Sequence, residues 1–517
     1  MYIPVSKFHT VGLVVLTCVG LVAHAGGGPK SRVRVASASN ATLMAEPFFS
    51  AACLASGRGR DYQVGPGAGQ LASLDQVPWE NLAAGDTVRI FYRATPYTGK
   101  VAINAHGTAS APVRVCGVKG PNGERPIIDG ANAVSRPSLS FGRSSASTIN
   151  QQRGIIMLVA SLADGNGNPT YVQIDGLKLQ HATSAYSYTD TSGIVQPYMD
   201  FGGCIWIEQG EHITIADNEI TDCSQAIFSR SADWATNYVT KDIRIAGNTM
   251  TNNGVVGDMH MHTTYIQSVG ITYEFNRYGP LRPGAAGNSI KDRSVGAVVR
   301  YNRIEDGTYG IDLVDAEDYA RTALANPAYR TAFVYGNQFA LPATTVMLHY
   351  GGDHIGSEAN YRKGTLYFYN NTVHFTGTAN AAFLFRLSTT DETAQVWNNL
   401  FTFDPGIQYP AMRIGQDAAV GYTAGGILNL GANWITAGWA DSDPWHPVPG
   451  QLNGGQNMIT GAIPPIDPST LLPHGGSIFL GKARKQSAGA PPVQYQLDAR
   501  LRPMVRKSAD DLGAIEH

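Results

Sequence analysis

The chain has 517 residues, of which 43% are hydrophobic and only 15% are charged, and its net charge is -2 at pH 7. Ordinary soluble domains have about 25% charged residues, and the balanced charge predicts no general attraction to nucleic acid or anionic lipid. The 58 glycines and 28 prolines make the chain rich in turns, yet below the level of low-complexity sequence, which excludes collagen, coiled coil and disorder. A long solenoid with many turns fits this composition better than several ordinary domains.

The first 25 residues are typical of a secretory signal peptide. Lys7 and His9 precede an apolar run over residues 11–22, and Ala23-His24-Ala25 forms a small-x-small cleavage site. This run is shorter than the roughly 20 residues that a membrane-spanning helix needs. We therefore predict a secreted or periplasmic protein that is cleaved near Ala25 and has no membrane association afterwards.

The remaining chain divides by composition. Residues 26–60 are rich in Gly, Ser and Ala and are predicted to form a flexible linker. The folded domain is expected to cover residues 61–517. Within it we distinguish an N-terminal portion, 61–170, repeat coils at about 171–440, and a C-terminal cover, 441–517.

Four cysteines remain after cleavage, and export permits disulfide bonds. Pairing Cys53 with Cys116 and Cys204 with Cys223 closes two local loops, and we favour this arrangement. Four buried free thiols are the alternative. Because no CxxC motif occurs, neither a zinc cluster nor a redox motif is predicted.

From Tyr171 onward one pattern recurs, in which apolar residues stand five and three positions before an asparagine and two positions after it. Eight asparagines, 26 to 35 residues apart, follow this frame: Asn218, Asn248, Asn276, Asn302, Asn337, Asn371, Asn399 and Asn433. Alternation with a period of two predicts strands, and a repeat near 30 residues without helical segments predicts one coil of a stack per repeat. The predicted fold is all-β, a right-handed single-stranded parallel β-helix. We expect the asparagines to form a structural ladder at turns, where Asn tolerates left-handed geometry.

Stacked coils align their outward side chains in rows, because neighbouring strands are about 4.8 Å apart. Reactive side chains concentrate on the strand after each asparagine turn, and they are His260, His262 and Tyr265, then Lys291 and Arg293, then Asp312, Asp315 and Glu317, and later His349 and Arg386. Lys291 and Asp312 are 21 residues apart, near one short coil. Since Ile311 and Leu313 flank Asp312, we expect Asp312 to point outward.

This cluster is interpreted either as a functional site or as a surface ion-pair ladder worth about 0–1 kcal/mol per pair. Such a density of titratable groups in a chain with few charges favours a functional site. We assign Lys291, Arg293, His262, Tyr265 and Asp312 as candidate catalytic residues. The candidate substrate-binding residues are His260, Arg282, Asp315, Glu317, His349 and Arg386, and no metal ligands are assigned.

Several segments resemble exported bacterial β-helix proteins of the pectate-lyase-like superfamily, many of which degrade polysaccharides. These segments are Val64–Gly67, Gly85–Val88, Pro126–Gly130, Gly287–Ser294, Arg300–Asn302 and Leu512–Glu516. The resemblance covers roughly residues 61–517. Within the superfamily, the strand around Lys291 is similar to that of the alginate lyase and chondroitinase B group, in which a lysine is the catalytic base.

That resemblance implies β-elimination, in which a base removes the C5 proton of a uronate and a donor protonates the leaving O4. The uronate carboxylate must be neutralised, and a lysine base must have its pKa lowered by about 2–3 units from its usual value. Arg293 favours such a shift, whereas Asp292 and Asp312 oppose it. Arg293 or Arg282 is expected to neutralise the carboxylate, with Tyr265 or His262 as a further acid or base.

The chain departs from this group at two places. One coil after the lysine the group has an arginine acid, whereas this chain has Asp312. The group holds Ca²⁺ with acidic residues shortly before the lysine, whereas Gly284, Ala285 and Ala286 are neutral here, so a calcium cofactor is not matched.

We predict an exported enzyme that degrades an acidic polysaccharide, its only predicted partner, as a polysaccharide lyase. The alternatives are a glycoside hydrolase that uses Asp312 and Asp315, with Glu317 as a further carboxylate, a uronate C5-epimerase, and a non-catalytic carbohydrate-binding β-helix. A hydrolase requires two carboxyl groups about 5–5.5 Å or 6.5–9.5 Å apart. Detection of an unsaturated product distinguishes elimination from hydrolysis.

Overall fold

A computed structural model describes residues 52–142, 144–160, 167–234, 238–417, 422–423, 425–445, 448–476, 481–484, 493–497, 503–507 and 510–516. The chain divides into two compact units, residues 1–45 and 46–517, and only the second contains described residues. The predicted signal peptide and most of the predicted linker lie outside the described residues. No helix in the described part of the chain has the length and apolar character needed to cross a membrane.

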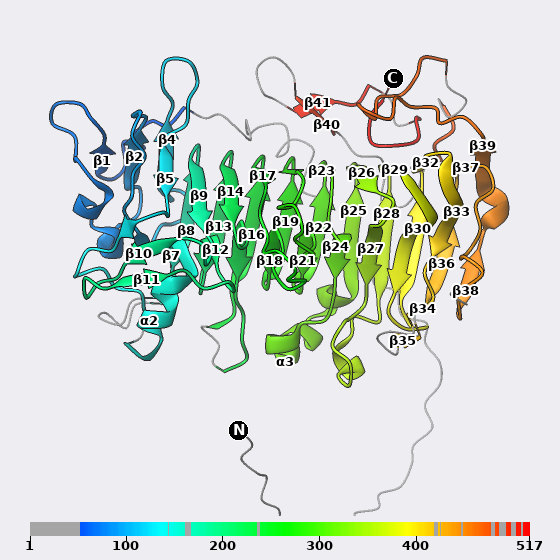
Figure 1. Cartoon of the computed structure of the whole chain (residues 1–517), viewed down its shortest axis with the longest axis horizontal. Helices are drawn as coiled ribbons and strands as arrows, with labels where there is room; N and C mark the ends of the chain where they lie inside the picture. The colour runs from blue at the N-terminus through cyan, green and yellow to red at the C-terminus, as the bar shows by residue number, and fades with distance from the viewer. Residues whose placement is uncertain are drawn as a thin grey trace, which may run out of the picture. The chain divides into compact units, whose positions relative to one another are not determined.

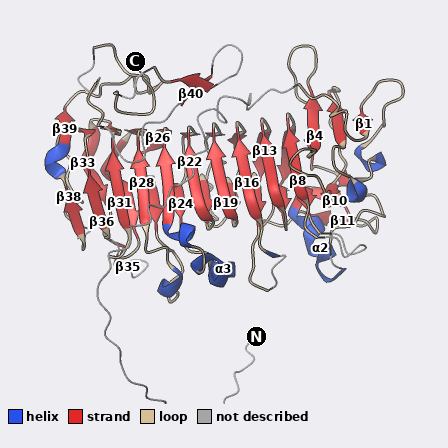
Figure 2. Cartoon of the chain, turned by 180° about the vertical axis from the view of Figure 1, so that it is seen from behind, coloured by secondary structure: helices blue, strands red, loops and turns tan. Residues whose placement is uncertain are grey.

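Three long parallel sheets make up the described fold, and successive coils add one strand to each of them (Figures 1 and 2). Sheet 1 is seen from outside in Figure 2. Its strands are β1 (Asp61–Val64), β2 (Thr87–Phe91), β4 (Val113–Val118), β8 (Thr170–Asp175), β13 (Glu211–Ala216), β16 (Lys241–Ala246), β19 (Val269–Glu274), β22 (Val295–Arg300), β25 (Thr331–Tyr335), β28 (Thr365–Tyr369), β31 (Thr393–Trp397), β36 (Ile427–Leu430) and β38 (Gln451–Asn453).

The other two sheets follow the same coil order. Sheet 2 contains β5 (Ile127–Asp129), β9 (Lys178–Ala182), β14 (Glu219–Cys223), β17 (Thr249–Thr251), β20 (Arg277–Tyr278), β23 (Arg303–Ile304), β26 (Gln338–Pro342), β29 (Thr372–Thr376), β32 (Leu400–Phe403), β37 (Asn433–Thr436) and β39 (Met458–Gly461). Sheet 3 contains β3 (Val101–Ile103), β7 (Gly154–Leu158), β12 (Gly203–Ile207), β15 (Ile227–Ser229), β18 (Thr264–Ile266), β21 (Ile290–Asp292), β24 (Tyr309–Leu313), β27 (Val346–Tyr350), β30 (Thr378–Leu387) and β33 (Gly406–Arg413). The predicted all-β parallel β-helix is therefore the observed fold.

Short elements decorate this stack. The minor strands are β6 (Ala133–Val134), β10 (Ser187–Thr189), β11 (Val195–Pro197), β34 (Gln416–Asp417), β35 (Tyr422–Thr423), β40 (Val493–Leu497) and β41 (Pro503–Val505). The helices are α2 (Ser144–Arg153) and α3 (Ala320–Leu324), and the 3-10 turns are η1 (Leu74–Gln76), η2 (Trp79–Asn81), η4 (Glu317–Tyr319), η5 (Pro327–Arg330), η6 (Glu358–Asn360) and η7 (Gly455–Asn457). In Figure 1, α3 lies below the strands labelled β18 and β21.

The apolar frame of the repeat supplies the core. Residues of this frame occupy matched positions on neighbouring strands, as Ile213, Ile243 and Ile271 do on β13, β16 and β19. The frame residues are buried in one continuous hydrophobic cluster. Each coil thus buries its apolar side chains against the coils on both sides, as expected for a solenoid.

The eight repeat asparagines form an uninterrupted hydrogen-bonded ladder. The side-chain amide of Asn302 donates to Oδ1 of Asn337 over 3.0 Å, and the same bond of 2.9–3.1 Å joins every consecutive pair. All eight are buried, so the predicted structural role is confirmed. We expected the asparagine itself to adopt the left-handed backbone conformation. The residue before it adopts this conformation instead, as Phe275 and Tyr301 do with φ of 56°.

Both favoured disulfides are present, Cys53–Cys116 and Cys204–Cys223. Coil stacking extends beyond residue 440, because β38 pairs with β36 and β39 pairs with β37. The C-terminal residues then return to sheet 2, where the backbone N–H of Ala514 donates to the Thr372 hydroxyl over 3.0 Å. Leu512 packs there with Leu400 and Trp434.

Candidate functional site

One row of side chains runs across the outer face of sheet 3. Its members, in matched register on consecutive strands, are Met157, Trp206, Phe228, Tyr265, Lys291, Asp312, His349 and Arg386. Their strand neighbours Ile290, Ile311 and Leu313 are buried in the core, which fixes the outward direction of the row. The half of the row toward the N-terminus is apolar and aromatic, and the other half is charged. The register therefore brings Tyr265, Lys291 and Asp312 together.

Lys291 lies between two carboxylates. Its ammonium contacts Oδ2 of Asp312 at 2.6 Å and also contacts Oδ2 of Asp353. Burial opposes the charge on Lys291, but these carboxylates outweigh it and raise the lysine pKa above its usual value. The lowered pKa that a lysine base needs is thus not found. The reason is the second carboxylate, Asp353, whose position beside Lys291 was not predicted from the sequence.

Asp312, the next member of the row, is buried and hydrogen-bonded on both carboxylate oxygens. Besides Lys291, it accepts from the side-chain amide of Asn288 over 2.8 Å and from Nδ1 of His349 over 2.8 Å. Burial raises the pKa of Asp312, but Lys291 and His349 together outweigh burial and lower this pKa to about 2. Asp312 is therefore ionised at neutral pH and is not available as a general acid.

Arg293 follows directly after β21 and contacts four side chains. Its Nε donates to the hydroxyl oxygen of Tyr265 over 2.8 Å. Its terminal nitrogens lie 3.4 Å from Asp315, 3.3 Å from Glu317 and 3.0 Å from Asp353. The predicted neighbours Asp315 and Glu317 do reach Arg293, and burial of the guanidinium is outweighed by these partners, which raise its pKa.

His262 is buried beside Tyr265, with ring centroids 5.5 Å apart. Its Nδ1 accepts the backbone N–H of Asn288 over 2.9 Å, which assigns the proton of the neutral ring to Nε2. Burial and the nearby charge of Lys291 lower the pKa of His262 to about 3. His262 is therefore a neutral hydrogen-bond donor at physiological pH, and it cannot take a proton at Nδ1 without losing this bond.

His349 and Arg386 extend the row beyond Asp312. Nε2 of His349 contacts the hydroxyl of Ser388 at 2.8 Å, and Arg386 donates to the hydroxyl of Tyr309 over 2.7 Å. The rings of Tyr309 and His349 lie 5.1 Å apart. Since Tyr309 is only half-buried, it presents this end of the row to solvent.

Two predicted residues have other partners. The side chain of His260 is 77% exposed and contacts Asp258 at 3.0 Å. Arg282 pairs with Asp222 and donates to the backbone oxygen of Gly254 over 2.8 Å. None of these contacts joins either residue to Lys291 or Arg293, so they give no support to the expected neutralising role of Arg282.

The sequence interpretation missed Asp353, Asn288, Tyr309 and Ser388. Asp353 comes shortly after the strand of His349, in the run Gly351-Gly352-Asp353-His354. A glycine pair before a carboxylate indicates a close approach of the backbone. This pair was the feature of the sequence from which Asp353 could have been chosen as a candidate. Among the described residues, no group of three or more His, Cys, Asp or Glu side chains is arranged to hold a metal ion.

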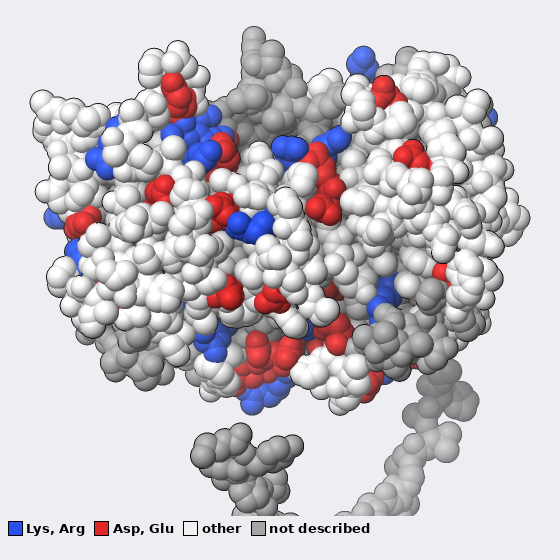
Figure 3. Space-filling view, viewed as in Figure 1, with Lys and Arg blue, Asp and Glu red and all other residues white. Residues whose placement is uncertain are grey.

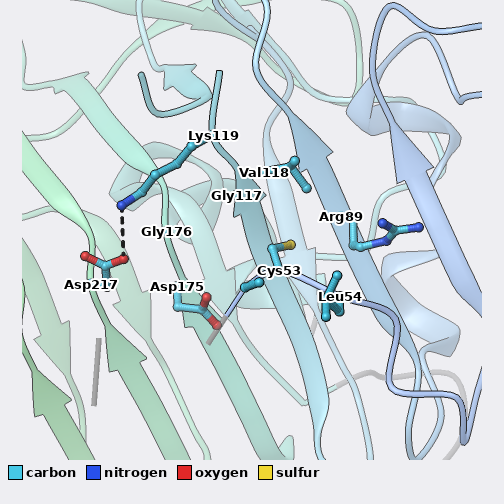
Figure 4. A pocket seen from close by; sticks show the side chains of 10 residues that line it. Cys53, Leu54, Arg89, Gly117, Val118, Lys119, Asp175, Gly176 and Asp217 are labelled. Atoms are coloured by element: carbon cyan, nitrogen blue, oxygen red, sulfur yellow. Dashed lines mark ion pairs between the residues drawn. The ribbon is translucent and has the colours of Figure 1, made fainter. Parts of the chain in front are cut away.

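A cavity of about 370 Å³ lies elsewhere, against sheet 1 near the N-terminal coils (Figure 4). Its charged side chains form ion pairs, as Lys119 does with Asp217 at 3.7 Å and Asp175 does with Arg114 at 2.8 Å. Cys53, which also lines it, is in a disulfide. This cavity contains none of the row on sheet 3, and we assign it no chemistry.

No protein-family model matches the chain, and no curated protein sequence matches it significantly. Among solved structures, an alginate lyase from Paenibacillus sp. str. FPU-7 matches with 16% identity, 67% of this chain and 96% of that chain covered, and a TM-score of 0.42. XylC in complex with xylose matches with 11% identity, coverage of 76% and 86%, and a TM-score of 0.43. Pectate lyase Pel9A matches with 11% identity, coverage of 93% and 100%, and a TM-score of 0.40. At such low identities and TM-scores these matches do not define the chemistry, and the parallel β-helix is established by the chain's own strand pairings.

Proposed function

We propose that this protein degrades a uronic acid-containing polysaccharide by β-elimination. The observation that supports this most directly is the in-register pairing of Tyr265 and Lys291 on neighbouring strands, with Arg293 donating to the tyrosine oxygen. Elimination needs one group that accepts the C5 proton, one that donates a proton to the leaving O4, and a donor for the carboxyl group. These three residues supply the three roles on one face of the coil stack.

The charge states assign the roles. Lys291 is held in its ammonium form by Asp312 and Asp353, so it is the proton donor to the leaving oxygen. The Tyr265 oxygen accepts a hydrogen bond from the guanidinium of Arg293, a contact that stabilises a phenolate once it forms, and it is assigned as the base. The predicted role of Lys291 as base is thus replaced by that of acid.

The proposed step is balanced. The phenolate oxygen of Tyr265 forms a bond with the C5 proton, and the electrons of the C5–H bond form the C4–C5 double bond. The C4–O4 bond breaks, and the departing oxygen takes a proton from Lys291. Exchange with water then returns a proton to Lys291 and removes one from Tyr265.

The test is digestion of a panel of uronate polymers, with ultraviolet absorbance of the unsaturated ends and new reducing ends followed together. Tyr265→Phe removes only the phenolic oxygen, and we expect it to abolish the ultraviolet signal while the circular dichroism of the fold is retained. Tyr62→Phe on β1, remote from the row on sheet 3, is the matched control and retains activity. An active Tyr265→Phe enzyme contradicts the assignment of the base.

Hydrolysis is the second candidate, because Arg293 also joins two carboxylates that reach solvent. Its Nη2 lies 3.3 Å from both Asp353 and Glu317, and the two side chains are 29% and 39% exposed. This geometry places two carboxyl groups close together, as a glycosidase requires. New reducing ends without unsaturated product support this candidate and contradict elimination.

We also infer that the protein is exported. The support is the N-terminal segment that ends at Ala25, together with the two disulfides, which persist in oxidising compartments. Mass spectrometry of the protein recovered outside the cytoplasm is expected to give an N-terminus at Gly26. An N-terminus at Met1 in that material contradicts cleavage.

A further inference from the structure

Asp353 occupies the slot between the two cations of the site. Its Oδ1 lies 3.0 Å from Nη1 of Arg293, and its Oδ2 contacts both Lys291 and Nη2 of Arg293. The Asp353 side chain is 29% exposed, whereas those of Lys291 and Arg293 are 6% and 7% exposed. A group that approaches from solvent therefore meets this carboxylate before it meets either cation.

The backbone fixes Asp353 in this position. Its N–H donates to Oδ1 of Asp315 over 2.9 Å, and the N–H of Gly352 donates to the Ser388 hydroxyl over 2.8 Å. A Cβ atom on Gly352 would lie 2.1 Å from the ring of Tyr361, so only glycine fits there. These two hydrogen bonds and the close approach at Gly352 position Asp353.

The charge balance of the site follows from its ion pairs. Lys291 contacts Asp312 and Asp353, and Arg293 contacts Asp353, Asp315 and Glu317. Lys291 and Arg293 thus face four carboxylates, of which Asp312 also contacts His349 at 2.8 Å and Glu317 also contacts His354 at 3.2 Å. On the face in Figure 3, most acidic side chains have basic side chains beside them. A ligand that brings another negative charge must displace Asp353 or pay the cost of like charges in contact, several kcal/mol.

An esterified uronate avoids this conflict. Its carbonyl oxygen can accept a hydrogen bond from Arg293 while it adds no charge. The proton alpha to an ester is also more acidic than the proton alpha to a carboxylate, because the carbanion-like state does not place two negative charges on one group. The chemistry at C5 then needs no further cation.

We propose that Asp353 determines the specificity of this site: it fills the carboxylate slot between Lys291 and Arg293, so the reacting sugar is a uronic acid whose carboxyl group is esterified. This inference rests on the proposed function for its chemistry, but its recognition step can be measured alone. Asp353 selects the substrate through Lys291 and Arg293 and takes no part in bond breaking.

The experiment compares oligogalacturonides and oligomannuronates of equal length, each as the free acid and as the methyl ester. Binding is measured by calorimetry and turnover by ultraviolet absorbance, for the wild type and for Asp353→Asn. The wild type is expected to favour at least one of the two esters over its free acid by about tenfold or more in affinity. In Asp353→Asn the preference for the ester falls by about tenfold or more, because the free acid binds more tightly once the Asp353 charge is removed.

Asp242→Asn is the matched control, since Asp242 is an exposed carboxylate paired with His212 on sheet 1, and it leaves the ratio unchanged. The wild-type ratio is decisive even if Asp353→Asn fails to fold. Preference of the wild type for the free acids overturns the inference, as does binding of neither form, or an unchanged ratio in a folded Asp353→Asn. Selective ester binding without unsaturated product supports the inference while it refutes β-elimination.

Discussion

The backbone N–H of Asn288 donates to Nδ1 of His262 over 2.9 Å, and this single bond determines what the histidine can do. The ring keeps its proton on Nε2 and remains neutral, because burial and Lys291 lower its pKa to about 3. We therefore expect His262 to show no titration between pH 5 and 8. Long-range nitrogen–proton NMR of labelled histidine is the measurement, with the exposed His260 as an internal control. A midpoint near 6–7, close to the ordinary histidine value, contradicts the assignment.

Removal of Lys291 is expected to affect stability as well as turnover. Lys291→Met leaves Asp312 and Asp353 without their shared cation, and such a loss costs about 3–5 kcal/mol when the remaining charge is buried. The double variant Lys291→Met/Asp312→Asn removes one of those charges and is expected to recover part of this loss. Urea unfolding measures both. Lys363→Met, in the exposed pair with Asp391, is the control and changes stability by less than about 1 kcal/mol. If Lys291→Met and Lys363→Met lower the free energy of unfolding equally, the buried ion pairs of Lys291 do not stabilise the fold as proposed.

The pH dependence of stability has a defined sign. The pKa of Asp312 is lowered in the folded state, to about 2, below the value of about 3.9 for an unperturbed aspartate. The carboxylate therefore contributes stability that is present above about pH 4 and is lost as the pH falls through about 2. The pKa of Lys291 is raised, so its contribution is present below about pH 10.4 and is lost only above that value. Chemical unfolding at pH 5 and pH 2.5 is expected to show this loss, and a smaller one in Asp312→Asn.

Each asparagine of the ladder is expected to contribute to the free energy of unfolding. Asn302→Ala removes the link between Asn276 and Asn337 and leaves buried amide partners unsatisfied. Such a loss costs about 1–3 kcal/mol for each unsatisfied group. Asn429→Ala is the control, because Asn429 forms an exposed pair with Asn453. Thermal unfolding is the measurement, and equal changes for the two variants would contradict a buried ladder.

The fold could be predicted from local periodicity because each coil repeats the same pattern of apolar residues around an asparagine. Ile213, Asn218 and Ile220 define a coil whose partners follow at a nearly constant interval, so strands, core and ladder all follow from one pattern. The row of Tyr265, Lys291 and Asp312 was predictable for the same reason. These side chains belong to strands, where the direction of a side chain follows from alternation.

The remainder of the site lies outside that regularity. Asp353 comes from the loop after β27, and neither a period nor alternation specifies the position of a loop residue. The pKa of Lys291 depends on that loop, so the sequence could give its position but not its charge state. Arg282 also lies outside the strands, and neither a period nor alternation predicts its ion pair with Asp222.

The site residues of the row lie on four consecutive strands of sheet 3, β18, β21, β24 and β27, and this arrangement determines which coils can be changed without disturbing them. In a stack where each coil contacts only its neighbours, coils can be inserted or removed as modules if the ladder and register are kept. A coil added between β30 and β33 would lengthen the molecule while the strands β18 to β27 stay adjacent. The candidate site could therefore be transferred to another β-helix as four consecutive coils, together with the loops that follow β24 and β27.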